Sequence, residues 1–119
     1  MKTPRYFLAS LGLLGATFVH AYTGNELLAD FEAQGVRRVG SMQYVRWVVD
    51  GITSSQIATR RDFVCIPERV TVGQITDVAI NELQRSPANR HLDAGAIVYL
   101  AFVETWPCKA GTGNPRQGR

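Results

Sequence analysis

The two cysteines of this chain, Cys65 and Cys108, bracket two segments whose patterns are both typical of helices. The first segment opens at Thr71 with T-x-x-Q, a capping box in which the threonine hydroxyl accepts from the Gln74 amide while the Gln74 side chain reaches back. Asp93 stands at the N-cap position of the second segment. A bond between the cysteines would tie together the far ends of a helical hairpin, which restricts the folds open to this half of the chain.

The N-terminal residues have the pattern of a cleavable secretory signal. Lys2 and Arg5 supply its positive charge, residues 6–19 form an apolar run too short to span a bilayer comfortably, and small residues lead up to a cleavage position after Ala21. We expect a signal peptide over residues 1–21, with an uncleaved membrane anchor as the alternative. Export would place the cysteines in an oxidising compartment, so we predict that they form one disulfide.

The mature chain is long enough for one small domain, since 119 − 21 = 98 residues remain. We assign residues 22–108 to this domain and expect the Gly/Pro-rich tail, residues 109–119, to be disordered. A domain of this size buries only about 60–65% of the surface that its unfolded chain exposes. Closing a loop of about 44 residues with a disulfide contributes roughly 4 kcal/mol at most, which could decide whether the domain stays folded.

Hydrophobic periodicity and capping signals predict an all-α fold, a small bundle of about four helices. A second capping box, Thr23 to Glu26, starts the first helix, which should end near Gly35. The other three expected helices run from Met42 (capped by Ser41) to about Gln56, from Val72 to about Arg85, and from Ala94 to Trp106.

Trp47 lies outside the apolar stripe of the second expected helix. Placing successive residues about 100° apart groups the stripe on one side, made of Tyr44, Val45, Val48, Val49 and Ile52. A displaced tryptophan either packs on a neighbouring element, such as the first helix, or contacts a partner protein. We favour packing and keep Trp47 as a candidate partner-binding residue.

The last two helices carry different patterns. In the third, Val72 and the other apolar residues line one face, and Glu82 falls within it. We interpret Glu82 as a carboxylate that pairs with a nearby arginine, with a functional role as the alternative. The fourth is apolar on several sides, Leu100 included, so we expect neighbouring elements to surround it.

Charge and composition argue against several function classes. The net charge of +3 falls to +1 without Lys2 and Arg5, because 11 basic residues then face 10 acidic ones. No basic stripe with interleaved aromatic residues is present, so we expect no nucleic-acid partner. After signal cleavage we expect no membrane association, and no sequence pattern calls for a cofactor.

A catalytic constellation is not evident either. Cys65 and His91 could form a nucleophile–base pair, but a disulfide would consume the thiol. His91 is the only histidine of the mature chain and has no metal-ligand spacing around it. These patterns favour a protein that works by contact rather than an enzyme.

Several segments resemble the Tai/Rap immunity proteins of type VI secretion systems, over nearly the whole mature domain. The most specific is C-I-P-E, which begins at Cys65, with its spacing to the closing W-P-C. The similar segments are T-G-N-E-L-L (23–28), Y-V-R-W-V-V-D-G (44–51), V-C-I-P-E-R-V-T-V-G-Q (64–74), R-H-L-D-A (90–94) and F-V-E-T-W-P-C (102–108).

The resemblance implies a periplasmic antidote to a peptidoglycan amidase toxin, a homodimeric helical protein that occludes the active-site cleft of that toxin. Many members carry a further cysteine pair, at places where this chain has Phe31 and Ser41, so its first helix must be held by packing alone. Gln43 and Trp47 also stand where small glycines are common.

Insertion into a cleft requires a protruding, constrained polar loop, since ordering a floppy one would cost affinity. Two segments qualify: Pro87 to Leu92 between the last two helices, and the turn from Thr59 to Asp62. Our candidate partner-binding residues in the first are Asn89, Arg90 and His91. The alternative interpretation is an ordinary solvated connection.

The leading function is therefore inhibition of a cell-wall amidase toxin in the periplasm. The second is a periplasmic binding or assembly module for another envelope protein or an apolar ligand. An envelope hydrolase is the third and weakest interpretation.

Overall fold

The computed structural model describes residues 20–109. The predicted signal peptide up to residue 19 and the predicted tail from residue 110 lie outside the described residues. Within residues 20–109 no helix is both long and apolar enough to cross a membrane.

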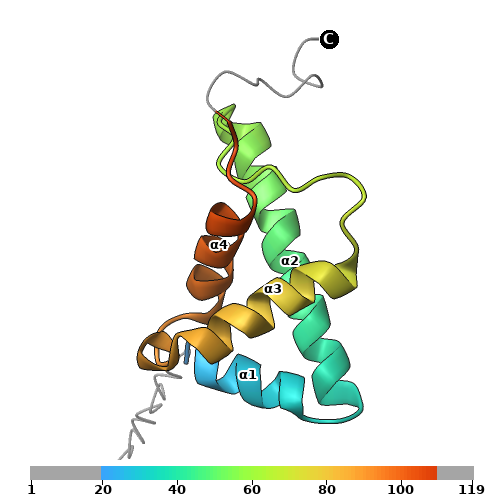
Figure 1. Cartoon of the computed structure of the whole chain (residues 1–119), viewed down its shortest axis with the longest axis vertical. Coiled ribbons are helices and arrows are strands. Elements are labelled where there is room, and N and C mark those ends of the chain that lie inside the picture. Colours follow the sequence, from blue (N-terminus) through green and yellow to red (C-terminus); the bar gives the residue numbers. More distant parts are fainter. Residues whose placement is uncertain (1–19, 110–119) are drawn as a thin grey trace, which may run out of the picture.

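The described part of the chain is all-α, as predicted, and forms a small bundle without a strand. Its helices are α1 (Gly24–Glu32), α2 (Val36–Thr59), α3 (Val72–Arg85) and α4 (Ala94–Thr105), with a 3-10 turn at Pro87–Asn89. Figure 1 shows the long α2 crossed by α3, with α1 closing one end and α4 beside the upper half of α2.

The helix starts read from local sequence signals are confirmed for α1, α3 and α4. Both capping boxes form; in α3 the Gln74 amide donates to the Thr71 hydroxyl (3.2 Å) and the Thr71 amide donates to Gln74 Oε1 (2.8 Å). The Ala96 amide donates to Asp93 Oδ1 (2.9 Å), which caps α4. Side chains that pair with the backbone of the first turn thus define these ends.

The predicted start of α2 is wrong, because the helix begins at Val36 rather than Met42. Gly35 takes the N-cap position with φ 71°, a conformation that glycine adopts without steric cost. Ser41 lies inside the helix, where its hydroxyl donates to the Arg38 carbonyl oxygen (2.7 Å). A serine can bond to the preceding turn as readily as it caps a following one, so its position did not identify the start.

The core lies where α1, α3 and α4 pack on the inner side of α2. Its largest fully buried side chains are Phe31, Phe102, Leu27, Leu83, Val45 and Val98. The apolar stripe predicted for α2 faces this core, with Val45 buried and the other members half-buried. Phe31 on α1 and Ser41 on α2 are 1% and 2% exposed. Packing holds α1 only in part, because its first amides also donate hydrogen bonds to the loop before α4.

One expectation about the last helices is wrong. The predicted apolar face of α3 packs into the core from Ile75 onward, while Val72, in the first turn, is 42% exposed. Leu100 is 58% exposed, so one side of α4 is open and the helix is not surrounded. The opposite side buries Ile97, Val98 and Phe102.

The disulfide between Cys65 and Cys108 is confirmed, with the two Cα atoms 5.0 Å apart. The two backbone segments beside the disulfide also pair with each other. The Cys65 amide donates to the Trp106 carbonyl oxygen (2.9 Å), and Val64 forms an isolated antiparallel β-bridge with Pro107. The bond joins the segment before α3 to the segment after α4 and closes 43 residues of sequence separation.

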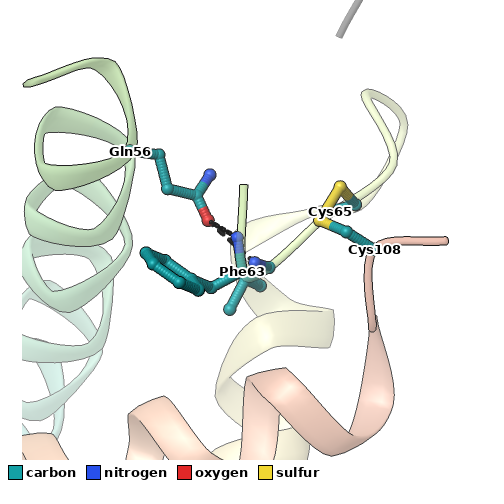
Figure 2. The surroundings of a disulfide bond; sticks show 5 residues. Gln56, Phe63, Cys65 and Cys108 are labelled. Atoms are coloured by element: carbon teal, nitrogen blue, oxygen red, sulfur yellow. Dashed lines mark hydrogen bonds between the residues drawn. A yellow bond between two sulfur atoms is a disulfide. The ribbon is translucent and has the colours of Figure 1, made fainter. Parts of the chain in front are cut away.

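Gln56, in the last turn of α2, holds the same segment from the other side. Its Oε1 accepts from the Phe63 amide (2.8 Å) and the Val64 amide (2.7 Å), as Figure 2 shows for Phe63. Arg60 ends α2 in the left-handed conformation (φ 53°) and turns the chain back toward Gln56. The linker is thus fixed to both α2 and α4.

The start of α1 rests against the loop between α3 and α4. The Gly24 amide donates to the Leu92 carbonyl oxygen (3.0 Å), and the Asn25 amide donates to the Arg90 carbonyl oxygen (2.8 Å). The first N–H groups of a helix have no partner within it. Here the loop supplies two of those partners, so helix and loop hold each other in place.

This close approach depends on Gly24 having no side chain. A Cβ at this position would lie 2.7 Å from Ile97 Cδ1, 3.0 Å from Leu83 Cδ2 and 3.1 Å from the Arg90 carbonyl oxygen. The first two atoms end side chains of the core, and the third belongs to the backbone of the loop. Only a glycine lets α1 begin here.

We predict that Gly24→Ala lowers the free energy of unfolding by about 1–3 kcal/mol, because the added methyl group overpacks the core against the loop. Urea unfolding measures the loss. Gly73→Ala is the matched control, since its Cβ would meet Thr71 Oγ1 at an ordinary 3.6 Å. Equal stability of the two variants would contradict the close approach.

Removing the disulfide by Cys65→Ala with Cys108→Ala should cost up to about 4 kcal/mol, because the unfolded chain regains the freedom of the closed loop. The urea midpoints of the oxidised wild type and the variant measure this cost. A reducing agent should lower the wild-type midpoint to that of the variant and leave the variant unchanged. A wild-type urea midpoint that does not change when the reducing agent is added would contradict a stabilising role of the disulfide.

A hydrogen-bonded cluster around Asp30 joins α1 to the first turn of α2. The Tyr22 hydroxyl donates to Asp30 Oδ2 (2.5 Å) and Arg37 Nε donates to Asp30 Oδ1 (2.7 Å). The bond from Tyr22 and then the Arg37 guanidinium lower the pKa of Asp30. Because the folded-state pKa lies below the unfolded value of about 3.9, this contribution is present above about pH 4 and is lost as pH falls through the folded-state pKa.

We therefore predict that Asp30→Asn is less stable than the wild type near neutral pH and that the gap narrows at about pH 3. Urea midpoints at the two pH values test this. Glu32→Gln, which removes an exposed carboxylate from the same helix, is the control. A gap that stays constant between the two pH values would refute the contribution of Asp30.

Candidate functional site

The loop from Pro87 to Leu92 is a rigid connection. Pro87–Asn89 form a 3-10 turn, the Asn89 amide donates to the Ser86 carbonyl oxygen (3.1 Å), and the Leu92 amide donates to the Asn89 carbonyl oxygen (2.9 Å). Together with the two bonds that the loop accepts from α1, these contacts fix its backbone. The constraint expected of an inserting loop is therefore present.

The three candidate side chains of this loop differ in exposure. Asn89 and His91 are exposed, whereas Arg90 is half-buried and its Nε is shielded from solvent without a hydrogen-bond partner. His91 Nδ1 lies 3.0 Å from the Ala88 carbonyl oxygen. Since a carbonyl oxygen only accepts, this bond needs the proton on Nδ1 and leaves Nε2 of a neutral ring as an acceptor. Asn89 and His91 are thus the side chains that a partner can reach.

Glu82 lies just before this loop and has a structural role, as we interpreted it. It pairs with Arg85 and accepts from the Ser86 hydroxyl (2.6 Å at Oε1), and Arg85 also donates to Glu104 on α4 (3.2 Å). The Ser86 bond, followed by the Arg85 contact, lowers the pKa of Glu82. Glu82 thus holds Arg85, and the Arg85 guanidinium connects the end of α3 to Glu104 of α4.

The second candidate, the turn from Thr59 to Asp62, lies elsewhere. Thr59 is still helical, with its hydroxyl donating to the Ser55 carbonyl oxygen (2.8 Å), so the turn begins at Arg60. In Figure 1 this turn is at the top of α2 and the loop between α3 and α4 is at the lower left. The two segments therefore cannot enter one cleft together.

Trp47 belongs to neither segment. It is 68% exposed, so the expectation that it packs on a neighbouring element is wrong. Trp47 lies near the middle of α2, and its exposed side chain is on the side of that helix opposite the buried Val45. Trp106 shows the contrast, since it is half-buried with its ring centroid 5.6 Å from that of Phe102.

The geometry gives no support to the nucleophile–base interpretation, which is wrong because Cys65 is bonded to Cys108. Among residues 20–109, no group of three or more His, Cys, Asp or Glu side chains is placed to hold a metal ion. The arrangement offers surfaces for contact.

Sequence reasoning missed Gly24, Gln56 and an exposed apolar face of α2. The exposed face could have been found from the spacing of Val36 and Val39 with Trp47, had the helix been started early enough. No local sequence pattern predicts the roles of Gly24 and Gln56, because those roles depend on contacts with distant segments.

A known protein family matches the chain over nearly all of its described residues. The family model for Rap1a immunity proteins matches residues 23–108, from the N-cap of α1 to the second cysteine of the disulfide. Neither a curated protein nor a solved structure matches the chain. The matched range contains all four helices, the loop between α3 and α4, and both cysteines, and the chain belongs to the Rap1a immunity protein family.

Proposed function

We propose that this protein is a periplasmic immunity protein that binds a peptidoglycan amidase toxin delivered by type VI secretion and inhibits it by occluding its active site. The observation that carries the proposal is the family match over residues 23–108, which spans the whole described fold. Members of this family generally act as inhibitors and not as enzymes. The proposed function therefore requires this chain to bind the toxin and requires no catalysis by the chain itself.

The loop between α3 and α4 is the element that we assign to the toxin cleft. Its backbone is fixed by bonds to α1 and within itself, so little conformational freedom would be lost on insertion. Asn89 offers an amide, and His91 offers a ring nitrogen. Donors and acceptors of this kind can pair with the polar groups of a hydrolase cleft, which would otherwise lose their hydrogen bonds to water.

Arg90 contributes differently from its two neighbours. Its carbonyl oxygen accepts from α1 and its side chain is half-buried, so reversing its charge would disturb folding and binding together. We assign Arg90 to holding the loop and place the direct contacts at Asn89 and His91.

The same family resemblance supports a proposal for the location and the assembly state. We propose a mature chain exported to the periplasm after removal of residues 1–21, acting as a homodimer. Protection then requires export of the immunity protein to the compartment in which the toxin cleaves the cell wall.

Asn89→Ala with His91→Ala should weaken toxin binding at least about tenfold, which corresponds to about 1.4 kcal/mol. The partner to test is any amidase toxin encoded beside this gene. Titration calorimetry on the purified pair measures binding, and survival of cells that export both proteins measures protection. Thermal stability should change little, because both side chains are exposed and the one side-chain bond lost, from His91 Nδ1 to the Ala88 carbonyl oxygen, is also exposed.

Asn81→Ala, which removes an exposed amide from α3, is the matched control and should bind normally. Arg61→Ala tests the turn after α2. Loss of binding in the Arg61 variant together with normal binding in the loop variant would move the site to that turn. Failure of the wild type to bind or to protect would refute the proposed function itself.

A further inference from the structure

One face of α2 is exposed from its first turn to its last. Placing successive residues about 100° apart collects ten exposed residues on the side of the helix opposite the core. We call it the α2 outer face; its members are Val36, Val39, Gly40, Gln43, Trp47, Asp50, Gly51, Ser54, Ile57 and Ala58.

The α2 outer face is more apolar than a solvent-facing helix surface needs to be. Val36 is 88% exposed, Ile57 is 69% exposed and Trp47 is 68% exposed, while Asp50 is the single charged member. Polar and charged residues normally occupy the side of a helix opposite the core. Tryptophan is among the residues most enriched at the centres of protein interfaces.

Two glycines in this face have no explanation within the fold. Glycine in a helix interior costs stability, because the unfolded chain has more freedom to lose. A Cβ built at Gly40 or at Gly51 meets nothing within 4 Å, so packing within the chain does not require either glycine. A second helix packed against this face would explain both glycines, since residues without side chains let two helix backbones come close.

We propose that the α2 outer face packs against the same face of a second copy of this chain, with the two α2 helices antiparallel and the two-fold axis near Trp47. The inference rests on the homodimer proposed above and assigns its contact surface. A two-fold dimer needs a self-complementary surface, in which each residue of one copy meets its counterpart across the axis.

Charge complementarity supports the second copy and sets the register. Arg46 borders the α2 outer face and stands four residues before Asp50. The antiparallel arrangement brings each Arg46 to the partner's Asp50, so that two ion pairs form from one sequence. The same register brings Val39 to the partner's Ile57. The two-fold axis of this register passes within one residue of the midpoint of Val36–Thr59, so the two α2 helices overlap along nearly their whole length.

Trp47 fits the same arrangement. Near the axis, each indole falls beside the partner's Gly51, which has no side chain to obstruct it. Packed helix axes lie about 8–10 Å apart, with the shorter distances where small residues face each other. The glycines then serve as recesses for the two tryptophans.

The size of the face indicates a weak dimer. A helix of 24 residues is about 36 Å long, but its ten outer residues are fewer than the roughly 20–30 per side of a standard interface. We therefore expect dissociation on the order of micromolar concentrations. Dimer formation should depend on protein concentration.

Sedimentation equilibrium of the oxidised mature chain tests the proposal over about a hundredfold range of concentration. The wild type should shift from monomer to dimer, and Trp47→Glu should weaken the dimer at least about tenfold. Leu100→Glu, at an apolar position of α4 that is 58% exposed, is the matched control and should dimerise as the wild type does.

Three further variants separate the surface from effects on folding. Arg46→Glu and Asp50→Arg should each weaken the dimer, and the two together should restore it, since both ion pairs return with exchanged signs. Gly51→Ala should raise the melting temperature of the dilute monomer, because its Cβ meets nothing, and should still weaken the dimer.

A wild type that stays monomeric at every concentration would overturn both the homodimer and this surface. A dimer that tolerates Trp47→Glu and both charge reversals would overturn the surface alone. Weaker toxin binding by Trp47→Glu without any change in dimerisation would assign the face to the toxin instead. Protection assays on the loop variants are independent of all these outcomes.

Discussion

The described fold depends most on the mutual support between the start of α1 and the loop that precedes α4. The loop gives carbonyl oxygens to the amides of Gly24 and Asn25, and the Ala94 amide at the start of α4 donates to the Tyr22 carbonyl oxygen (2.9 Å). Backbone groups near two helix starts are thus paired across segments about 70 residues apart. Neither the position of α1 nor the shape of the loop is set by its own sequence alone.

The opposite end of the molecule is held by different means. There the disulfide joins the flank of α3 to the flank of α4, and Gln56 accepts two amides of the linker from α2. A small domain buries too little surface to leave a long linker unattached. The disulfide therefore fixes the linker while the loop end relies on hydrogen bonds and a close glycine contact.

Features encoded by short spacings could be predicted from the sequence, and features that depend on distant segments could not. Thr23, Thr71 and Asp93 define helix starts through side chains that bond three residues ahead, so the pattern is complete within one turn. Ser41 led to a wrong start for α2, because its hydroxyl donates to the Arg38 carbonyl oxygen, in the preceding turn of a helix that has already begun. The half-burial of the Arg90 side chain depends on which elements lie nearby, and no local sequence pattern predicts it.

The α2 outer face and the loop between α3 and α4 are on opposite sides of the molecule, and this separation connects the two proposals. The inner side of α2 packs against α1, α3 and α4, and the loop joins two of those helices, as Figure 1 shows. A dimer formed through α2 would therefore leave both loops free and pointing outward. Each copy could then enter a separate toxin molecule, so pairing would add a second binding site without covering the first.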